Sequence, residues 1–169
     1  MAKEKLKHLV SKDAFNIDGL GKKVIQNFWD LNMIKYPSDI FNLNFKKISS
    51  LEGWGELSAS NLEKAIESAQ KVPLEKLIFA IGIRHVGQEN AKTLAKYFVS
   101  IKKFVELSDR AKRKKILNYL LEMDSIGITQ VNALDAFFSN STNLNIVSNL
   151  VKKLNVTDFK TIESGIFSG

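Results

Sequence analysis

Four short segments that end in glycine are the part of this chain whose residue types and spacing could do chemistry. Each has an apolar residue, two spacers, a second apolar residue and a glycine, and they occupy residues 17–21, 51–55, 83–87 and 123–127. An apolar pattern with helical spacing follows each segment, so each final glycine should open a helix. The first N–H groups of a helix have no partner within the helix, and the helix dipole is positive there. These helix starts could therefore bind an anion such as phosphate.

The two glycines of a segment have different predicted tasks. Gly19 and Gly53 lie in the middle of a turn, where the missing Cβ allows a backbone conformation that other residues disfavour. The final glycine, such as Gly21, leaves room for a phosphate to reach the helix amides. Between them, Leu20 or Trp54 can pack between the two helices and hold their angle. Amides that bind phosphates read no base sequence.

The four turns differ in sequence. His85 and Ser125 stand where the first two segments have their middle glycine. Ser125 leaves two interpretations of the fourth turn, a phosphate site or a mainly structural turn. Lys22 and Lys23 follow the first segment, whereas an acidic residue follows the second. We therefore expect the first turn to attract a phosphate more strongly, unless the lysines at 46–47 reach the same phosphate.

Apolar residues at helical spacing form the elements that must position these turns. The stripes are Leu74, Leu77, Ile78 and Ile81; Ala91, Leu94, Ala95 and Phe98; Val147, Leu150, Val151 and Leu154; Val24, Ile25, Phe28 and Leu31; and Leu62, Ala65, Ile66 and Ala69. Strand patterns are nearly absent, so we predict an all-α fold with these stripes in the core. The final glycines are 34, 32 and 40 residues apart, which indicates a repeated supersecondary unit.

The composition favours a polyanionic partner. Lys and Arg number 25 against 18 Asp and Glu, which points to nucleic acid or an anionic membrane surface. The absence of cysteine excludes disulfides and cysteine zinc sites from this sequence, and two distant histidines make us expect no metal site. No apolar run is long enough to span a membrane, and the first residues do not resemble a signal peptide, so we expect a cytoplasmic location.

Several runs resemble one protein family. Residues 6–21 are similar to the segment that follows the zinc finger in bacterial NAD-dependent DNA ligases, and residues 36–41 and 51–55 to the next part of that domain. The most specific match is residues 80–87, AIGIRHVG, followed by the AKTLA run at 91–95. The resemblance is dense from about Leu6 to Phe98 and thinner afterwards.

The resemblance implies four helix-hairpin-helix motifs arranged as two paired units, at residues 1–72 and 73–158, with residues 159–169 as a linker toward a BRCT domain. In that family the domain binds the minor groove of nicked double-stranded DNA beside the other ligase domains. The parent enzyme uses NAD and Mg²⁺, carries Zn²⁺ in its zinc finger, and seals breaks between 5′-phosphate and 3′-hydroxyl groups in replication and repair. The implied location is the bacterial cytoplasm, with the nucleoid.

We do not expect this chain to be an enzyme by itself. The family's adenylation lysine lies in a Lys-x-Asp-Gly motif, and Asn16 holds that position before Asp18 and Gly19. An amide cannot form the phosphoramidate intermediate, so no catalytic residue is expected. The expected DNA-binding residues are Gly19, Gly21, Lys22, Lys23, Gly53, Gly55, Arg84, His85, Gly87 and Gly127.

Other candidates have structural alternatives. Arg84 could reach a phosphate or the minor groove, or form a surface ion pair, and His85 is interpreted as a structural hydrogen-bonding residue. A basic cluster could contact the DNA backbone or be a solvated helix face; it consists of Arg110, Lys112, Arg113, Lys114 and Lys115. Trp29 and Trp54 fit core or hinge positions better than base-stacking platforms.

Two alternative functions stay open from the sequence, and a third lacks the residues that it would need. The chain could be a helix-hairpin-helix module of another DNA repair protein, such as a nuclease or a junction-binding subunit. It could be a helical protein-interaction module in which the glycines serve folding alone. A base-excision glycosylase would need a catalytic Asp and a base pocket, and no convincing pair is found.

Overall fold

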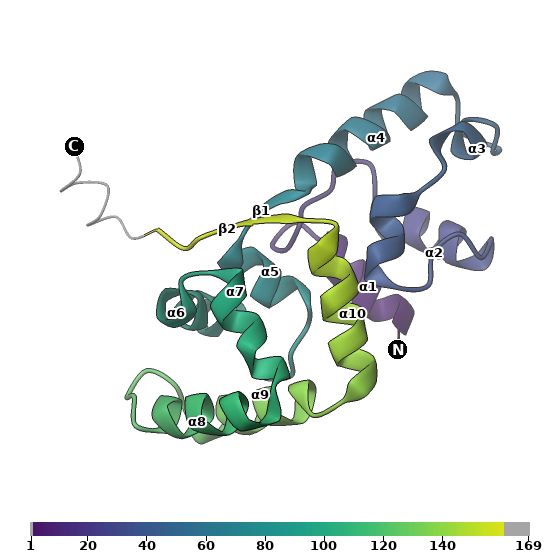
Figure 1. The fold of residues 1–169 in the computed structure, drawn as a ribbon. Coiled ribbons are helices and arrows are strands. Elements are labelled where there is room, and N and C mark those ends of the chain that lie inside the picture. Colours follow the sequence, from purple (N-terminus) through teal and green to yellow (C-terminus); the bar gives the residue numbers. More distant parts are fainter. Residues whose placement is uncertain (1, 161–169) are drawn as a thin grey trace, which may run out of the picture.

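The computed structural model describes residues 2–160 and confirms the all-α fold (Figure 1). Residues 161–169, most of the expected linker, lie outside the described part. The α-helices are α1 Ala2–Val10, α2 Lys22–Asp30, α3 Phe45–Ser49, α4 Glu56–Ala69, α5 Leu74–Ala80, α6 Gln88–Phe98, α7 Ile101–Phe104, α8 Arg110–Leu121, α9 Ile128–Phe138 and α10 Ser141–Lys152. Two 3-10 helices, η1 Pro37–Asn42 and η2 Val105–Ser108, and two strands, β1 Lys71–Pro73 and β2 Asn155–Thr157, complete the described elements.

The helices pack in consecutive pairs, each joined by one of the glycine segments. The pairs in contact are α1 with α2, α3 with α4, α5 with α6, and α8 with α9. The second helix of each pair begins directly after the final glycine, which is its N-cap. The prediction that these glycines open helices is confirmed.

The expected apolar stripes supply much of the core. Phe28, Leu94 and Leu150 are completely buried, and most of their stripe partners are buried or half-buried. Leu31 is the exception, with 44% of its surface exposed. Leu31 is exposed because α2 ends at Asp30 and Leu31 is its C-cap, so this residue no longer follows the helical spacing.

Contacts between distant segments hold the two halves of the chain together. Helix α1 packs against α5, where His8 Nε2 lies 2.8 Å from the carbonyl oxygen of Phe79 and the two rings meet edge to face at 4.7 Å. Helix α10 packs against η1. Strand β1, between α4 and α5, pairs in parallel with β2, so Lys71 lies opposite Asn155. The sequence did not indicate this strand pair, because three residues are too few to show an alternating pattern.

The outermost turns lie far from each other. In Figure 1 the turn between α3 and α4 and the turn between α8 and α9 stand at opposite ends of the molecule. Any single ligand that touched both of these turns would therefore have to be long.

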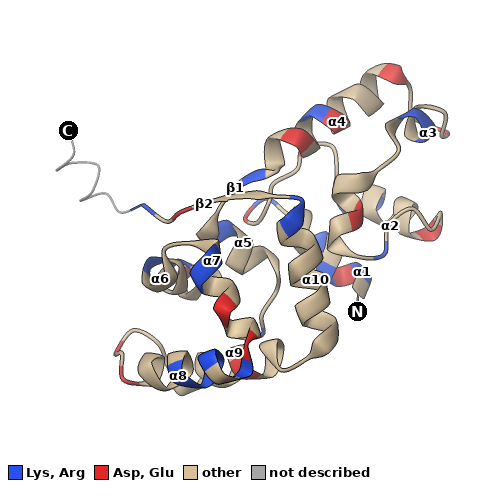
Figure 2. Cartoon of the chain, in the orientation of Figure 1, with Lys and Arg blue, Asp and Glu red and all other residues tan. Residues whose placement is uncertain are grey.

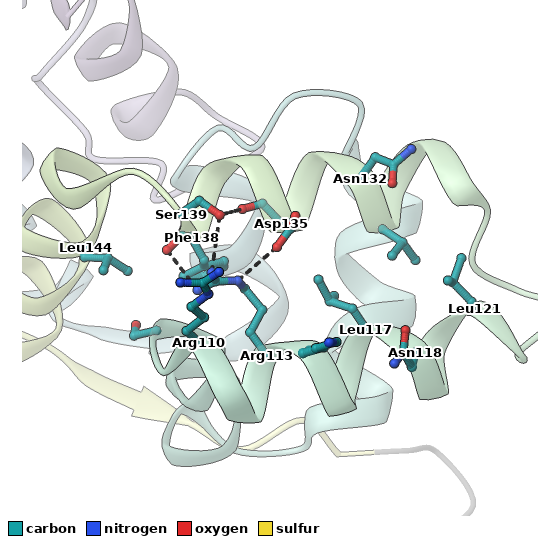
Figure 3. Close-up of a pocket in the computed structure, with 13 residues that line it drawn as sticks. Arg110, Arg113, Leu117, Asn118, Leu121, Asn132, Asp135, Phe138, Ser139 and Leu144 are labelled. Carbon is teal, nitrogen blue, oxygen red and sulfur yellow. Dashed lines mark hydrogen bonds and ion pairs between the residues drawn. The ribbon is translucent and has the colours of Figure 1, made fainter.

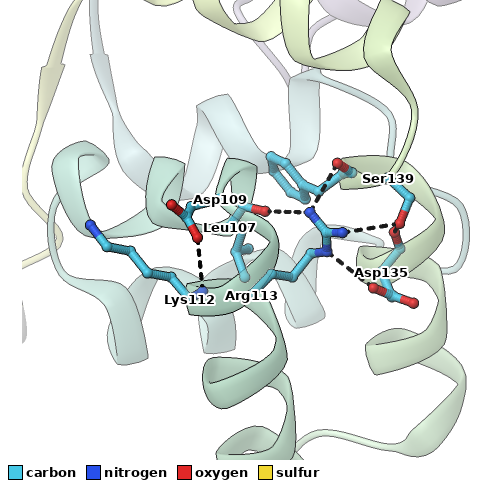
Figure 4. A network of polar contacts seen from close by, with 7 residues as sticks. Leu107, Asp109, Lys112, Arg113, Asp135 and Ser139 are labelled. Carbon is cyan, nitrogen blue, oxygen red and sulfur yellow. Dashed lines mark hydrogen bonds and ion pairs between the residues drawn. The ribbon is translucent and has the colours of Figure 1, made fainter.

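Arg113 fastens α8 to α9 from inside the protein (Figure 4). Only 7% of its surface is exposed. Its Nε donates to Asp135 Oδ1 at 3.0 Å, its Nη1 to the carbonyl oxygens of Leu107 and Phe138, and its Nη2 to Ser139 Oγ at 3.3 Å. Both interpretations of the basic cluster, DNA contact and solvated face, are wrong for this residue. It stands one turn before buried Leu117 and shares its inward position.

Candidate nucleic-acid interface

The first three turns share one backbone geometry. In each, the N–H of the fourth segment residue donates to the carbonyl oxygen of the first: Leu20 to Ile17 at 3.1 Å, Trp54 to Leu51 at 3.0 Å and Val86 to Ile83 at 3.1 Å. The third residue is left-handed, with φ of +85° at Gly19, +83° at Gly53 and +65° at His85. Among four-residue turns, those with a positive φ at the third residue favour glycine at that position. The task predicted for the middle glycines is therefore confirmed, whereas His85 adopts a conformation that costs a non-glycine residue about 1–2 kcal/mol.

The final glycines are not required by the fold at three of the turns. Gly21, Gly55 and Gly87 have φ of −84°, −150° and −86°, which any residue can adopt. A Cβ added to any of them would meet nothing within 4 Å, and all three are exposed. The space in front of these helix starts is therefore open to solvent.

The amides at these helix starts differ in how they are satisfied. No side chain caps α2 or α6, so their first-turn N–H groups are available to an external acceptor. At α4 no side chain caps the first-turn amides either, but the N–H of the N-cap Gly55 donates to Ser58 Oγ at 2.9 Å. Helices α2 and α6 therefore offer the least obstructed anion sites.

The first and second turns share one groove. It is lined by Asp18, Gly19, Val24, Gly53, Trp54, Ser58, Asn61 and Leu62. Trp54 is half-buried, and its ring centroid lies 5.7 Å from that of Phe28 in α2. Trp54 thus packs one hairpin onto the other, in agreement with its predicted core or hinge role, and Leu20 is buried as expected.

The third and fourth hairpins are joined at His85. Its carbonyl oxygen accepts hydrogen bonds from Asn90 Nδ2 at 3.3 Å and from Gln130 Nε2 at 3.2 Å. His85 is structural through this backbone oxygen, while its side chain is exposed. Sequence reasoning missed Asn90 and Gln130. Each stands three residues after the final glycine of its segment, a position from which a polar side chain can reach a helix start.

The fourth turn lacks the shared geometry. Within residues 2–160, no backbone hydrogen bond joins Met123 and Ile126, and Ser125 is not left-handed. A Cβ on Gly127 would lie 2.9 Å from Gln130 Oε1, so an acceptor oxygen already stands near this helix start. Two exposed acids, Glu122 directly before the turn and Asp124 within it, add negative charge there. The physical features of this turn fit a structural role better than phosphate binding.

Exposed cations accompany the first and third turns. Lys22, Lys23 and Arg84 are exposed, and none forms an ion pair with another residue in the range 2–160. The alternative of a surface ion pair at Arg84 is therefore not seen in the described structure. Figure 2 shows that basic residues are spread over most of the helices, with a concentration on α8.

Neither a metal-binding cluster nor a membrane-spanning helix is found in residues 2–160. They contain no group of three or more His, Asp or Glu side chains placed to hold a metal ion. Within the same residues, no helix is long and apolar enough to cross a bilayer.

Comparison with known proteins shows what the chain is similar to. Residues 76–147 match the helix-hairpin-helix motif family. The chain is 48% identical to a DNA ligase of Pelagibacter ubique over 94% of its length, 44% identical to one of Ehrlichia canis over 94%, and 36% identical to one of Rickettsia bellii over 93%. It covers only 23–24% of those proteins, so it spans about a quarter of their length. Residues 76–147 therefore carry the helix-hairpin-helix motif, and nearly the whole chain is similar to one segment of the DNA ligases.

Proposed function

We propose that this chain binds double-stranded DNA through backbone phosphates in the minor groove, without regard to base sequence. One observation carries the proposal: Gly21, Gly55 and Gly87 are exposed N-cap glycines that the fold itself does not require. A module whose glycines served folding alone would need a positive φ or a crowded Cβ position there. Room for an approaching phosphate explains why glycine stands at these three helix starts.

The binding chemistry follows from the helix starts. Free N–H groups in the first turns of α2 and α6 donate to phosphate oxygens, and the helix dipoles favour the negative charge. Lys22 and Lys23 add charge at the first turn, and Arg84 adds charge and a forked donor at the third. Gly19, Gly53 and His85 act indirectly by holding their turns in shape.

The role in the whole protein is also part of the proposal. The chain would serve an NAD-dependent ligase that seals nicks between 5′-phosphate and 3′-hydroxyl groups in replication and repair, in the bacterial cytoplasm with the nucleoid. NAD, Mg²⁺ and Zn²⁺ would be bound by the other ligase domains, and nicked duplex would be the preferred partner. The paired units would span residues 1–72 and 73–158, with β1 at their boundary. Alone, the chain would join no ends.

A salt titration of binding to nicked and intact duplexes tests the proposal. For each phosphate neutralised, the logarithm of the association constant should fall by about 0.9 per log unit of salt. Unrelated duplex sequences should bind equally well, and branched junctions should bind no better than nicked duplex. A flat salt response would contradict phosphate binding, and a strong preference for junctions would favour a junction-binding module.

A further inference from the structure

The fourth hairpin combines the turn least suited to phosphate with the densest positive charge of the chain. Its turn has neither the shared hydrogen bond nor an open helix start. Five of the six residues at 110–115, at the start of α8, are nevertheless basic. If the fourth hairpin contacts a polyanion, it would therefore do so through groups other than the amides of its turn.

Three cations of α8 are available to a partner. Arg113 is buried, and Lys112 Nζ lies 3.7 Å from Glu106 Oε2. The remaining cations, Arg110, Lys114 and Lys115, are exposed and form no ion pair within residues 2–160. We name these three residues the α8 ridge.

The ridge borders a polar groove between α8 and α9 (Figure 3). Arg110, Lys114 and Asn118 line it from α8, and Asn132 of α9 and Ser139, the C-cap of α9, line the other side. The acid in this groove is Asp135, whose carboxylate is paired with Arg113 at 3.0 Å. Because Arg113 offsets that negative charge, Arg110 and Lys114 leave the groove net positive.

The helix is also held firmly enough to present these charges. Arg113 donates hydrogen bonds to two carbonyl oxygens and to two side chains, which fixes α8 against α9. Asp109 caps the start of α8 by accepting from the N–H of Lys112 at 3.0 Å. Arg110 and Lys114 stand one turn apart, with a separation of about 5–6 Å expected between their Cβ atoms. Cations at such a spacing can contact neighbouring phosphates along one strand.

We propose that the α8 ridge binds phosphates of the duplex, so that the fourth hairpin engages DNA through side chains of its first helix and not through the amides of its turn. The inference rests on the proposed function, since it assumes that the partner is duplex DNA. Charge-assisted hydrogen bonds from the ridge replace those that the open helix starts make elsewhere. Gly127→Ala should therefore change DNA affinity less than Gly87→Ala.

The test compares two pairs of lysines in duplex-binding titrations. Lys114→Gln/Lys115→Gln removes two charges from the ridge. Lys152→Gln/Lys153→Gln removes two charges that are also exposed, at the end of α10 that leads into β2 and lies away from α8 in Figure 1. The ridge variant should weaken binding at about 0.1 M salt by roughly tenfold or more relative to the control variant and lower the salt slope by about 1–2. Thermal unfolding should show that both variants stay folded.

The outcomes separate this inference from the proposed function. If the ridge variant and the control variant lost the same duplex affinity, the proposed role of the α8 ridge would be overturned, because only the net charge would matter. If Gly21→Asp still weakened binding in that case, the proposed function would stand without the ridge. If the unaltered chain failed to bind duplex at low salt, both proposals would fall.

Discussion

At the scale of single residues, the two glycines of a turn separate folding from binding. Gly19 has a φ of +85°, which only glycine adopts without strain, whereas Gly21 has an ordinary φ of −84° and an empty Cβ position. Substitutions at these two positions of one turn should therefore have opposite effects on the free energy of unfolding. That contrast allows a binding defect to be distinguished from a folding defect.

Gly21→Asp is predicted to weaken DNA binding while keeping or raising stability. Aspartate is a better N-cap than glycine and its charge suits the helix dipole, so the free energy of unfolding should rise by about 0.3–1 kcal/mol. The same carboxylate would occupy the phosphate position and repel it, so duplex affinity should fall by at least about tenfold. Urea unfolding and duplex titration measure the two effects.

Gly19→Ala is the matched control for this prediction. A Cβ at positive φ should cost about 1–2 kcal/mol of folding free energy. If Gly21→Asp lost stability as Gly19→Ala does, its weaker binding would have a folding cause, and the helix start would lose its assigned role.

At the scale of elements, Arg113 links α8 to α9 through side-chain hydrogen bonds. The side chain is buried, and its removal leaves the carbonyl oxygens of Leu107 and Phe138 without this donor. Arg113→Ala should therefore lower the free energy of unfolding by about 2–4 kcal/mol, as expected when a buried charged donor is lost. Urea denaturation checks the value, with Lys115→Ala as the exposed control, expected within about 0.5 kcal/mol of the unaltered chain. Equal stabilities of the two variants would contradict the structural role.

The start of α8 should give the stability a dependence on acidic pH. The hydrogen bond from the backbone N–H of Lys112 is the main cause that holds the pKa of Asp109 below its ordinary value of 3.8. Because the folded pKa is the lower one, the stabilisation is present above pH 3.8 and is lost as pH falls through the folded pKa.

Asp109→Asn tests this dependence, since the amide oxygen keeps a cap acceptor but does not titrate. Unfolding by urea between pH 2.5 and pH 7 should show the unaltered chain gaining stability over Asp109→Asn as pH rises. If the stability difference between the unaltered chain and Asp109→Asn stayed constant across this range, Asp109 would not be the source of the pH dependence.

At the scale of the whole molecule, local features were predictable from the sequence, whereas contacts between distant segments were not. The turns and helix starts follow from residues that are neighbours in sequence, as the confirmed tasks of Gly19 and Gly53 show. The contact of His8 with Phe79 joins positions 71 residues apart, and no local pattern indicates it. Arg113 is instructive because its place on the inward face of α8 was visible from its spacing to Leu117, but its charge suggested the surface.

The separation of the hairpins predicts how affinity depends on DNA length. The turn between α3 and α4 and the turn between α8 and α9 lie at opposite ends in Figure 1. A chain of this length has a radius of gyration of about 15 Å and a width of about 40 Å, which corresponds to roughly 12 base pairs at about 3.4 Å each. Affinity should therefore rise as the duplex is lengthened from about 6 to about 14 base pairs. The rise should exceed the statistical increase that comes from the larger number of binding positions on a longer duplex.

The same length series assigns the contacts to their ends of the molecule. Lys114→Gln/Lys115→Gln should bind short duplexes almost as well as the unaltered chain and lose most of the gain on longer ones, because a short duplex held at the first hairpins does not reach α8. Gly21→Asp should weaken binding at every length. If the ridge variant instead lost the same factor on short and long duplexes, the phosphates would not run from one end of the protein to the other, and the hairpins would not act on a single length of DNA.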